Sequence, residues 1–199
     1  MKQILFFTSL IAFIGGLIIA QQYFSKRVPP SSKQIPIAGK TFGGEFTLQP
    51  DGGKAVSLSD FRGKVVVVYF GFTSCPDVCP TSLAVISNAL KSLPADEVAD
   101  VQGLFISLDP ERDTGAKLKQ YAQYFHKNIM GVTGTVEQVT KVARQYGTYF
   151  TKVAGSSDTN YLIDHTSATF IIGKDGKFAT SKSHGATAEQ ITEAIRSAL

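Results

Sequence analysis

From about residue 41 onward, hydrophobic and polar residues follow alternating strand and helix patterns. Residues 45–49 and 55–58 alternate like the two strands of a hairpin around the turn Asp51-Gly52-Gly53. The continuous apolar run at 65–70 is typical of a strand buried on both faces. Helical spacing follows a short turn later, at Leu83, Ile86, Ala89, Leu90 and Leu93.

The second half of the chain continues this alternation. Residues 101–108, 148–153, 167–172 and 178–181 have the pattern of strands, and the turn at 174–177 joins the last two. Three helices are expected, capped by Asp113, Thr135 and Thr187 and ending near His126, Gln145 and Ala198. The pattern predicts a thioredoxin-like α/β fold, with a central sheet flanked by helices and an N-terminal β-hairpin.

The N-terminal segment has a different character. Residues 4–20 are uncharged and mainly apolar, which predicts a single transmembrane anchor or uncleaved signal behind a short tail at 1–3. Ile18, two positions before Ala20, argues against cleavage because a small residue is expected there. The proline-containing stretch 21–40 is expected to be a linker, which leaves 41–199 as the folded domain.

The charges beside this segment bear on its orientation. Lys26, Arg27 and Lys33 outnumber Lys2, which by the positive-inside rule would keep the domain in the cytosol. Long domains are translocated with less regard to charge, so we expect export. The N-terminus lacks an Arg-rich transit peptide, which favours a bacterial inner membrane with the soluble domain in the periplasm.

Composition narrows the class of function. With 199 residues, 43% of them apolar, the chain can bury one sizeable core. The formal net charge is +4, but Lys and Arg are spread along the chain, with no run longer than Lys26-Arg27. A nucleic-acid binder is expected to cluster its cations, so we predict no nucleic-acid partner.

Cys75 and Cys79 are the only cysteines in the sequence. A bridge across three residues would be a poor staple, because the entropic gain of a disulfide grows with loop length. The pair follows the buried strand and opens the next helix, where the helix dipole favours thiolate and Pro76 needs no hydrogen-bond donor. If the turn is already helical at Cys75, cysteines four residues apart share a helix face, so both sulfurs can reach one ion or each other.

Two thiolates select soft ions such as Cu(I), Zn(II) or iron–sulfur centres, and a third ligand must be found among three histidines. His165 is the best candidate because it lies in the loop before the predicted strand 167–172, with Asp164 available to orient its ring. Such a set suits Cu(I), or Cu(II) with an added ligand, and requires reduced cysteines. We expect His126 and His184 to be bystanders, and loop 109–114 to serve mainly as a turn and helix cap.

Several stretches together resemble the Sco/SenC family, the copper-binding assembly factors of cytochrome c oxidase. These are YFGFTSCPDVCP at 69–80, SLDPERDT at 107–114, GVTG at 131–134, Asp164-His165 and GKDG at 173–176. The resemblance implies a thioredoxin-like fold on one N-terminal anchor, with Cys75, Cys79 and His165 as copper ligands. Ser74 departs from the histidine that many members have there, and that histidine is not a ligand in the family pattern.

The resemblance also implies a role in building the binuclear copper centre of the oxidase. The chain would donate copper, reduce the cysteines of that centre, or both. Its partners would be the copper-receiving oxidase subunit and other copper chaperones or thiol reductants.

A second class of function stays open. A thiol–disulfide oxidoreductase or peroxidase of the same fold would use Cys75 and Cys79 as its catalytic pair. This alternative function gives His165 no chemical role. A lone histidine is, however, more often structural than ligating.

Overall fold

A computed structural model describes residues 42–50, 53–157 and 160–199. The predicted tail, membrane segment and linker, residues 1–3, 4–20 and 21–40, lie outside the described residues. Within the described residues, every helix is too short or too polar to cross a bilayer. Thr41–Leu199 forms a compact unit.

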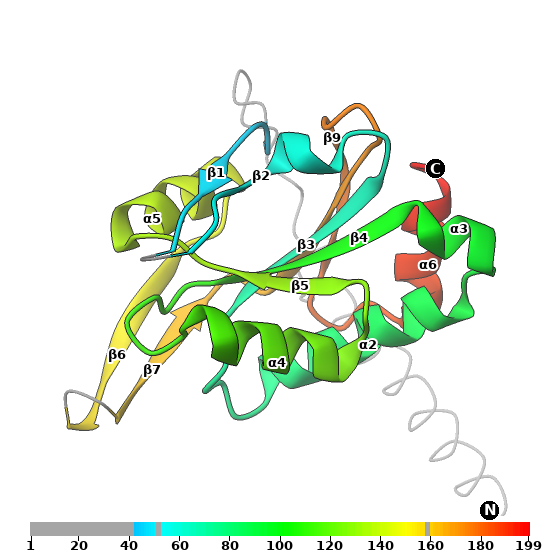
Figure 1. Cartoon of the computed structure of the whole chain (residues 1–199). Helices are drawn as coiled ribbons and strands as arrows, with labels where there is room; N and C mark the ends of the chain where they lie inside the picture. The colour runs from blue at the N-terminus through cyan, green and yellow to red at the C-terminus, as the bar shows by residue number, and fades with distance from the viewer. Residues whose placement is uncertain (1–41, 51–52, 158–159) are drawn as a thin grey trace, which may run out of the picture. The chain divides into compact units, whose positions relative to one another are not determined.

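A five-stranded mixed sheet stands at the centre of this unit (Figure 1). Its spatial order is β5-β4-β3-β8-β9, with β3, β4 and β5 parallel and β8 and β9 antiparallel to their neighbours. The strands are β3 Val65–Gly71, β4 Val101–Ser107, β5 Ile129–Val132, β8 Ala168–Ile172 and β9 Phe178–Ser183. Every residue of β3 is buried, which confirms the expected central strand.

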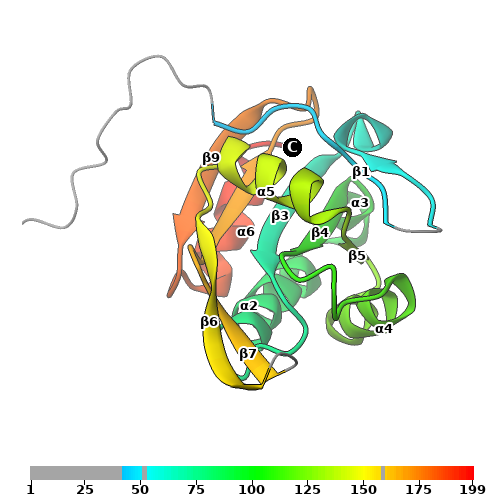
Figure 2. The ribbon, with the colours of Figure 1, turned by 90° about the vertical axis from the view of Figure 1, so that its left-hand side faces the viewer.

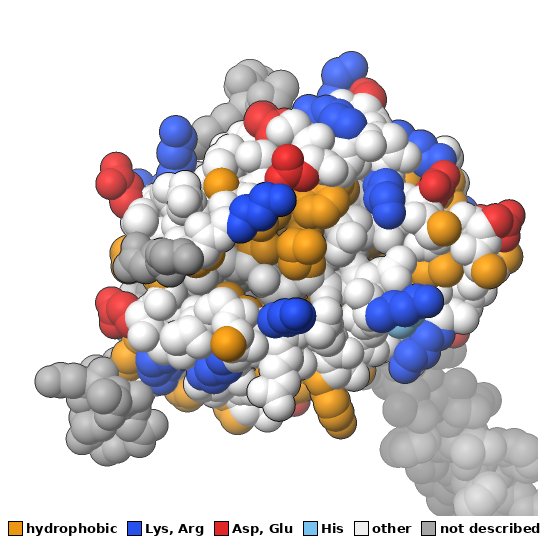
Figure 3. Space-filling view, viewed as in Figure 1, with side chains coloured by type: hydrophobic (Ala, Val, Ile, Leu, Met, Phe, Trp, Pro, Cys, Tyr) orange, Lys and Arg blue, Asp and Glu red, His pale blue; other side chains and the backbone are white. Residues whose placement is uncertain are grey.

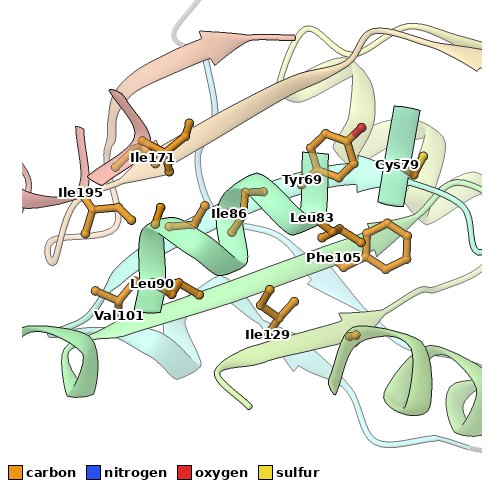
Figure 4. Close-up of a cluster of buried hydrophobic side chains, with 14 of the residues drawn as sticks. Tyr69, Cys79, Leu83, Ile86, Leu90, Val101, Phe105, Ile129, Ile171 and Ile195 are labelled. Carbon is orange, nitrogen blue, oxygen red and sulfur yellow. The ribbon is translucent and has the colours of Figure 1, made fainter. Parts of the chain in front are cut away.

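Successive residues of β3 point to opposite faces of the sheet, so the strand contributes to two cores. Val65, Val67 and Tyr69 belong to one core, which includes apolar residues of α2, α4 and α6 (Figure 4). Val66, Val68 and Phe70 belong to the other, with residues of α5 and the N-terminal hairpin. Figure 2 shows α5 and β1 on one side of the sheet and α2 and α6 on the other.

The helices that cover the sheet are α2 Val78–Ser92, α3 Ala95–Ala99, α4 Gly115–Phe125, α5 Val136–Gln145 and α6 Ala188–Arg196. Thr135 and Thr187 cap α5 and α6 through their side chains, as predicted. The predicted cap of α4 was wrong by one residue, because Thr114 accepts the hydrogen bond from the Lys117 amide. Asp113 is instead fully buried and bonded to other elements.

Several short elements differ from the sequence prediction. The N-terminal hairpin shrinks to β1 Thr47–Leu48 and β2 Val56–Ser57, because Leu58–Phe61 forms a 3-10 helix, η1. The short elements α3 and β5 were missed, since five and four residues are too few to show a clear period.

The strand predicted at 148–153 is β6 Phe150–Ser157, and it pairs with a second missed strand, β7 Asn160–His165. Leu162, an exposed apolar residue, blurs the alternation that would have revealed β7.

Charged side chains are mixed over the molecular face shown in Figure 3. Lys and Arg are scattered there among Asp and Glu, without forming one basic patch.

Candidate metal centre

The two cysteines lie where β3 passes into α2. Cys75 belongs to the turn after the strand, and Cys79 is the second residue of the helix. The backbone N–H of Cys79 donates to Cys75 Sγ over 3.4 Å, so the sulfur caps one of the unpaired amides of the helix N-terminus. The proline in the first helical turn is Pro80, not Pro76, which precedes the N-cap residue Asp77.

The two sulfurs have different surroundings. Cys75 is partly exposed, whereas Cys79 is 0% exposed and packs in the core (Figure 4). Burial raises the pKa of Cys79 to about 12, so its thiol is protonated at neutral pH. The expectation of a thiolate favoured by the helix dipole was therefore wrong for Cys79, because desolvation outweighs the dipole.

Gly71, the last residue of β3, makes room for the Cys79 sulfur. A Cβ atom at this position would lie 2.8 Å from Cys79 Sγ and 2.9 Å from the Phe105 ring. Contacts this short are repulsive, and both neighbours are fully buried. The lack of a side chain at Gly71 thus lets Cys79, the second residue of the helix, pack directly against the end of the central strand.

The sequence predicted that His165 lies in a loop, but His165 is the last residue of strand β7. Its Nε2 atom lies 3.4 Å from Cys79 Sγ, which brings these two predicted ligands into direct contact. The other ring nitrogen, Nδ1, lies 3.2 Å from the carbonyl oxygen of Thr166. A carbonyl oxygen only accepts hydrogen bonds, so Nδ1 carries the proton and Nε2 presents a lone pair to the Cys79 thiol.

Thr166 thus takes the orienting role that had been predicted for Asp164, which is exposed and pairs with Thr151 across the hairpin. Burial lowers the pKa of His165, although Asp164 and the Thr166 carbonyl act in the opposite direction. The ring also packs edge-on against Tyr69 and Phe72, at centroid distances of 6.4 and 6.2 Å. A neutral, oriented imidazole of this kind is suited to metal ligation.

The distance between sulfur and nitrogen is close to what one shared ion requires. With metal bonds of about 2.3 Å to sulfur and 2.05 Å to nitrogen, a trigonal or tetrahedral ion separates the two atoms by about 3.5–3.8 Å. A cleft of about 210 Å³ opens beside them, lined by Cys75, Asp77 and His165 among others. In the part of the chain that the structure describes, no three His, Cys, Asp or Glu side chains stand ready-grouped for a metal.

The remaining histidines lie on other elements. His126 is the C-cap residue of α4, where its Nδ1 accepts a hydrogen bond from the Asn128 amide at 3.1 Å. His184 is exposed in the loop between β9 and α6.

Sequence reasoning missed the contribution of loop 109–114. Asp109 and Asp113 are 1% and 0% exposed and bond to the segments that carry the candidate ligands. Their place at the C-terminal end of a buried parallel strand was the available signal.

Comparisons with known proteins agree with this geometry. The family model described as SCO1/SenC matches residues 35–199. The SCO2 homolog of Bos taurus mitochondria is 36% identical over 187 residues, which cover 93% of this chain and 70% of that protein.

Solved structures match the fold as well. Copper-bound ScoI of Bradyrhizobium japonicum is 36% identical, with a TM-score of 0.70 over 79% of this chain and 99% of that one. BsSco, described with a disulfide switch and as a member of the Sco family of cytochrome c oxidase assembly proteins, is 26% identical. Its TM-score is 0.61 over 83% of this chain and 98% of that one. The resemblance noted in the sequence is confirmed, and the chain belongs to the SCO1/SenC family.

Proposed function

We propose that this chain carries copper to cytochrome c oxidase, binding one ion through Cys75, Cys79 and His165 for assembly of the binuclear copper centre. The observation that carries the proposal is the 3.4 Å contact between Cys79 Sγ and the lone pair of His165 Nε2. It occurs in a chain whose fold matches copper-bound ScoI. Copper is the cargo here, taken up and released.

The donor set fits this cargo. Two thiolates and one imidazole suit three-coordinate Cu(I), and an added ligand would complete a site for Cu(II). His165 enters the reaction already neutral, whereas the buried Cys79 thiol must lose its proton when it becomes a ligand. Both cysteines must be reduced beforehand, because a disulfide does not supply the thiolate pair.

A copper titration of the reduced full-length protein tests the proposal. We expect one tightly bound copper per chain, lost in Cys75→Ser and Cys79→Ser and strongly weakened in His165→Ala. His184→Ala is the matched control, because it removes an imidazole from an exposed loop. Wild-type-like binding in the three site variants would reject the assignment of ligands. Cytochrome c oxidase activity, measured in cells that lack the gene with and without added copper, tests whether the oxidase is the recipient of the copper.

A second function of the same site, reduction of disulfides in the oxidase, is favoured by the unequal burial of the cysteines. Cys75 is partly exposed and its sulfur lies at a helix N-terminus, as expected of an attacking thiolate. It would attack a client disulfide to form a mixed disulfide and release one client thiolate. Cys79, after passing its proton to the His165 Nε2 atom 3.4 Å away, would then attack the Cys75 sulfur and release the second client thiolate. The two electrons that reduce the client come from oxidation of the pair to a disulfide.

This second function makes a distinct prediction for a disulfide-bonded peptide from the copper-binding segment of the client. In a variant with Cys79→Ser, the mixed disulfide with Cys75 should accumulate, and mass spectrometry would detect it. With Cys75→Ser no adduct should form. If the wild-type protein leaves the peptide oxidised, copper delivery alone remains.

We further propose that residues 4–20 anchor the domain on the periplasmic side of a bacterial inner membrane. The support is the uncharged apolar run of these residues. Protease added to intact spheroplasts should remove the domain. Complete protection, with cleavage only after lysis, would place the domain in the cytosol.

A further inference from the structure

The loop between β4 and α4 carries two carboxylates that are almost completely buried. Asp109 is 1% exposed and Asp113 is 0% exposed. Backbone hydrogen bonds from the amides of Arg112 and Asp113 to the Asp109 carbonyl fold the loop into a tight turn. Buried carboxylates are costly unless they are paired and hydrogen-bonded, so their partners identify what the loop holds in place.

Asp113 holds the segment that leads to the first cysteine. Its carboxylate accepts hydrogen bonds from the backbone amide of Thr73, at 2.9 Å, and from the Thr73 hydroxyl. It also accepts from Ser107 Oγ at 2.6 Å, at the end of β4, and from Lys117 Nζ at 3.1 Å. The turn two residues before Cys75 is thereby fixed to the central sheet.

Asp109 holds the hairpin that carries the histidine. The hydroxyl of Tyr161, in β7, donates to Asp109 Oδ1 at 2.6 Å. Arg112 pairs with the same carboxylate, donates from Nη1 to the Tyr161 carbonyl at 2.9 Å, and stacks its guanidinium 3.6 Å from the centre of the Tyr161 ring. Lys152 lies 4.7 Å from the ring centre. Tyr161 is thus held by its hydroxyl, its carbonyl and its ring.

These contacts matter because of how the hairpin is attached. In the described residues, β6 and β7 pair with each other and form a two-stranded sheet separate from the central five strands. A two-stranded hairpin is marginally stable by itself, so side-chain contacts must determine its position. In a strand, every second side chain points to the same face. One face of β7 therefore carries Tyr161, Ile163 and His165. Fixing Tyr161 therefore fixes the strand that places His165.

We propose that Tyr161 is a positioning residue for His165, acting through its hydrogen bond to Asp109, and that loop 109–113 thereby sets the separation between the histidine and the cysteines. The inference rests on the proposed copper site. Arg112 also lies 5.9 Å from the ring centre of Phe72, in the cysteine turn. One five-residue loop thus touches both ligand-bearing segments, which are far apart in sequence.

A double-mutant cycle on the reduced full-length protein tests this role. Tyr161→Phe removes only the hydroxyl and should weaken Cu(I) binding by about 10-fold, in the range usual for groups that orient metal ligands. In a protein that already has His165→Ala, adding Tyr161→Phe should cause no further loss, because the residue acts through that imidazole. Tyr149→Phe is the matched control, because this tyrosine is 72% exposed beside the same hairpin.

A second measurement uses the metal-free protein. NMR relaxation should show the hairpin and the His165 ring becoming more mobile in Tyr161→Phe and unchanged in Tyr149→Phe. Wild-type Cu(I) affinity in Tyr161→Phe, or losses that add to those of His165→Ala, would overturn the proposal, as would an unaltered His165 ring. Absence of copper binding in the wild-type protein would instead reject the proposed function.

Discussion

Replacing Gly71 by alanine tests the packing that brings Cys79 to the candidate site. The new methyl group would lie 2.8 Å from Cys79 Sγ, 2.9 Å from the Phe105 ring and 3.2 Å from the Tyr69 ring. All three side chains are at most 1% exposed, so none can move away into solvent. Overpacking of this kind costs about 1–3 kcal/mol. The helix must shift outward or the rings must leave their positions.

Chemical denaturation of the metal-free protein measures this cost directly. We expect a lower free energy of unfolding and a melting temperature reduced by roughly 2–4 °C for each kcal/mol. Copper affinity should fall as well, because the displaced sulfur moves relative to His165. Gly115→Ala is the control, since a Cβ there has no neighbour within 4 Å. If Gly71→Ala were as stable as Gly115→Ala and bound copper like the wild type, the packing argument would be refuted.

Three further predictions concern other positions. Burial lowers the pKa of His126 in the folded protein. As the pH falls through about 6.5, this imidazole is therefore protonated in the unfolded chain before it is protonated in the folded one. The free energy of unfolding should therefore drop more between pH 7.5 and 5.5 in the wild type than in His126→Gln. Loss of the side-chain cap in Thr187→Ala should destabilise α6 by about 1 kcal/mol, measured by urea denaturation, whereas Thr187→Ser should keep the cap. Iodoacetamide should alkylate Cys75 much faster than Cys79 in the reduced protein, as peptide mapping would show, and equal rates would contradict the difference in burial.

The sequence was most informative where local chemistry determines the structure. The continuous apolar run predicted the central strand, and Thr135 and Thr187 predicted their helix starts, because these signals depend on near neighbours. Asp113 was misassigned for the complementary reason. Aspartate is a common N-cap residue type, which made the assignment plausible. The carboxylate of Asp113 instead bonds to Thr73, after the end of β3, and to Ser107, at the end of β4, and no local pattern reveals these contacts.

The candidate site was predictable in its residue types but not in its electrostatics. Cysteine spacing and the position of His165 indicated the pair that the structure brings into contact. The state of the Cys79 thiol was predicted wrongly, because its burial depends on packing against β3, with room provided by Gly71. Likewise, the orienting partner of His165 is a backbone carbonyl, which side-chain identity does not report.

The contact between Cys79 and His165 has a consequence for a protein that must give its cargo away. A buried ligand that loses its ion would ordinarily be left as a polar group without a partner, at a cost of about 1–3 kcal/mol. Here the thiol and the imidazole nitrogen satisfy each other at 3.4 Å. The metal-free protein therefore leaves neither of these two groups without a hydrogen-bonding partner.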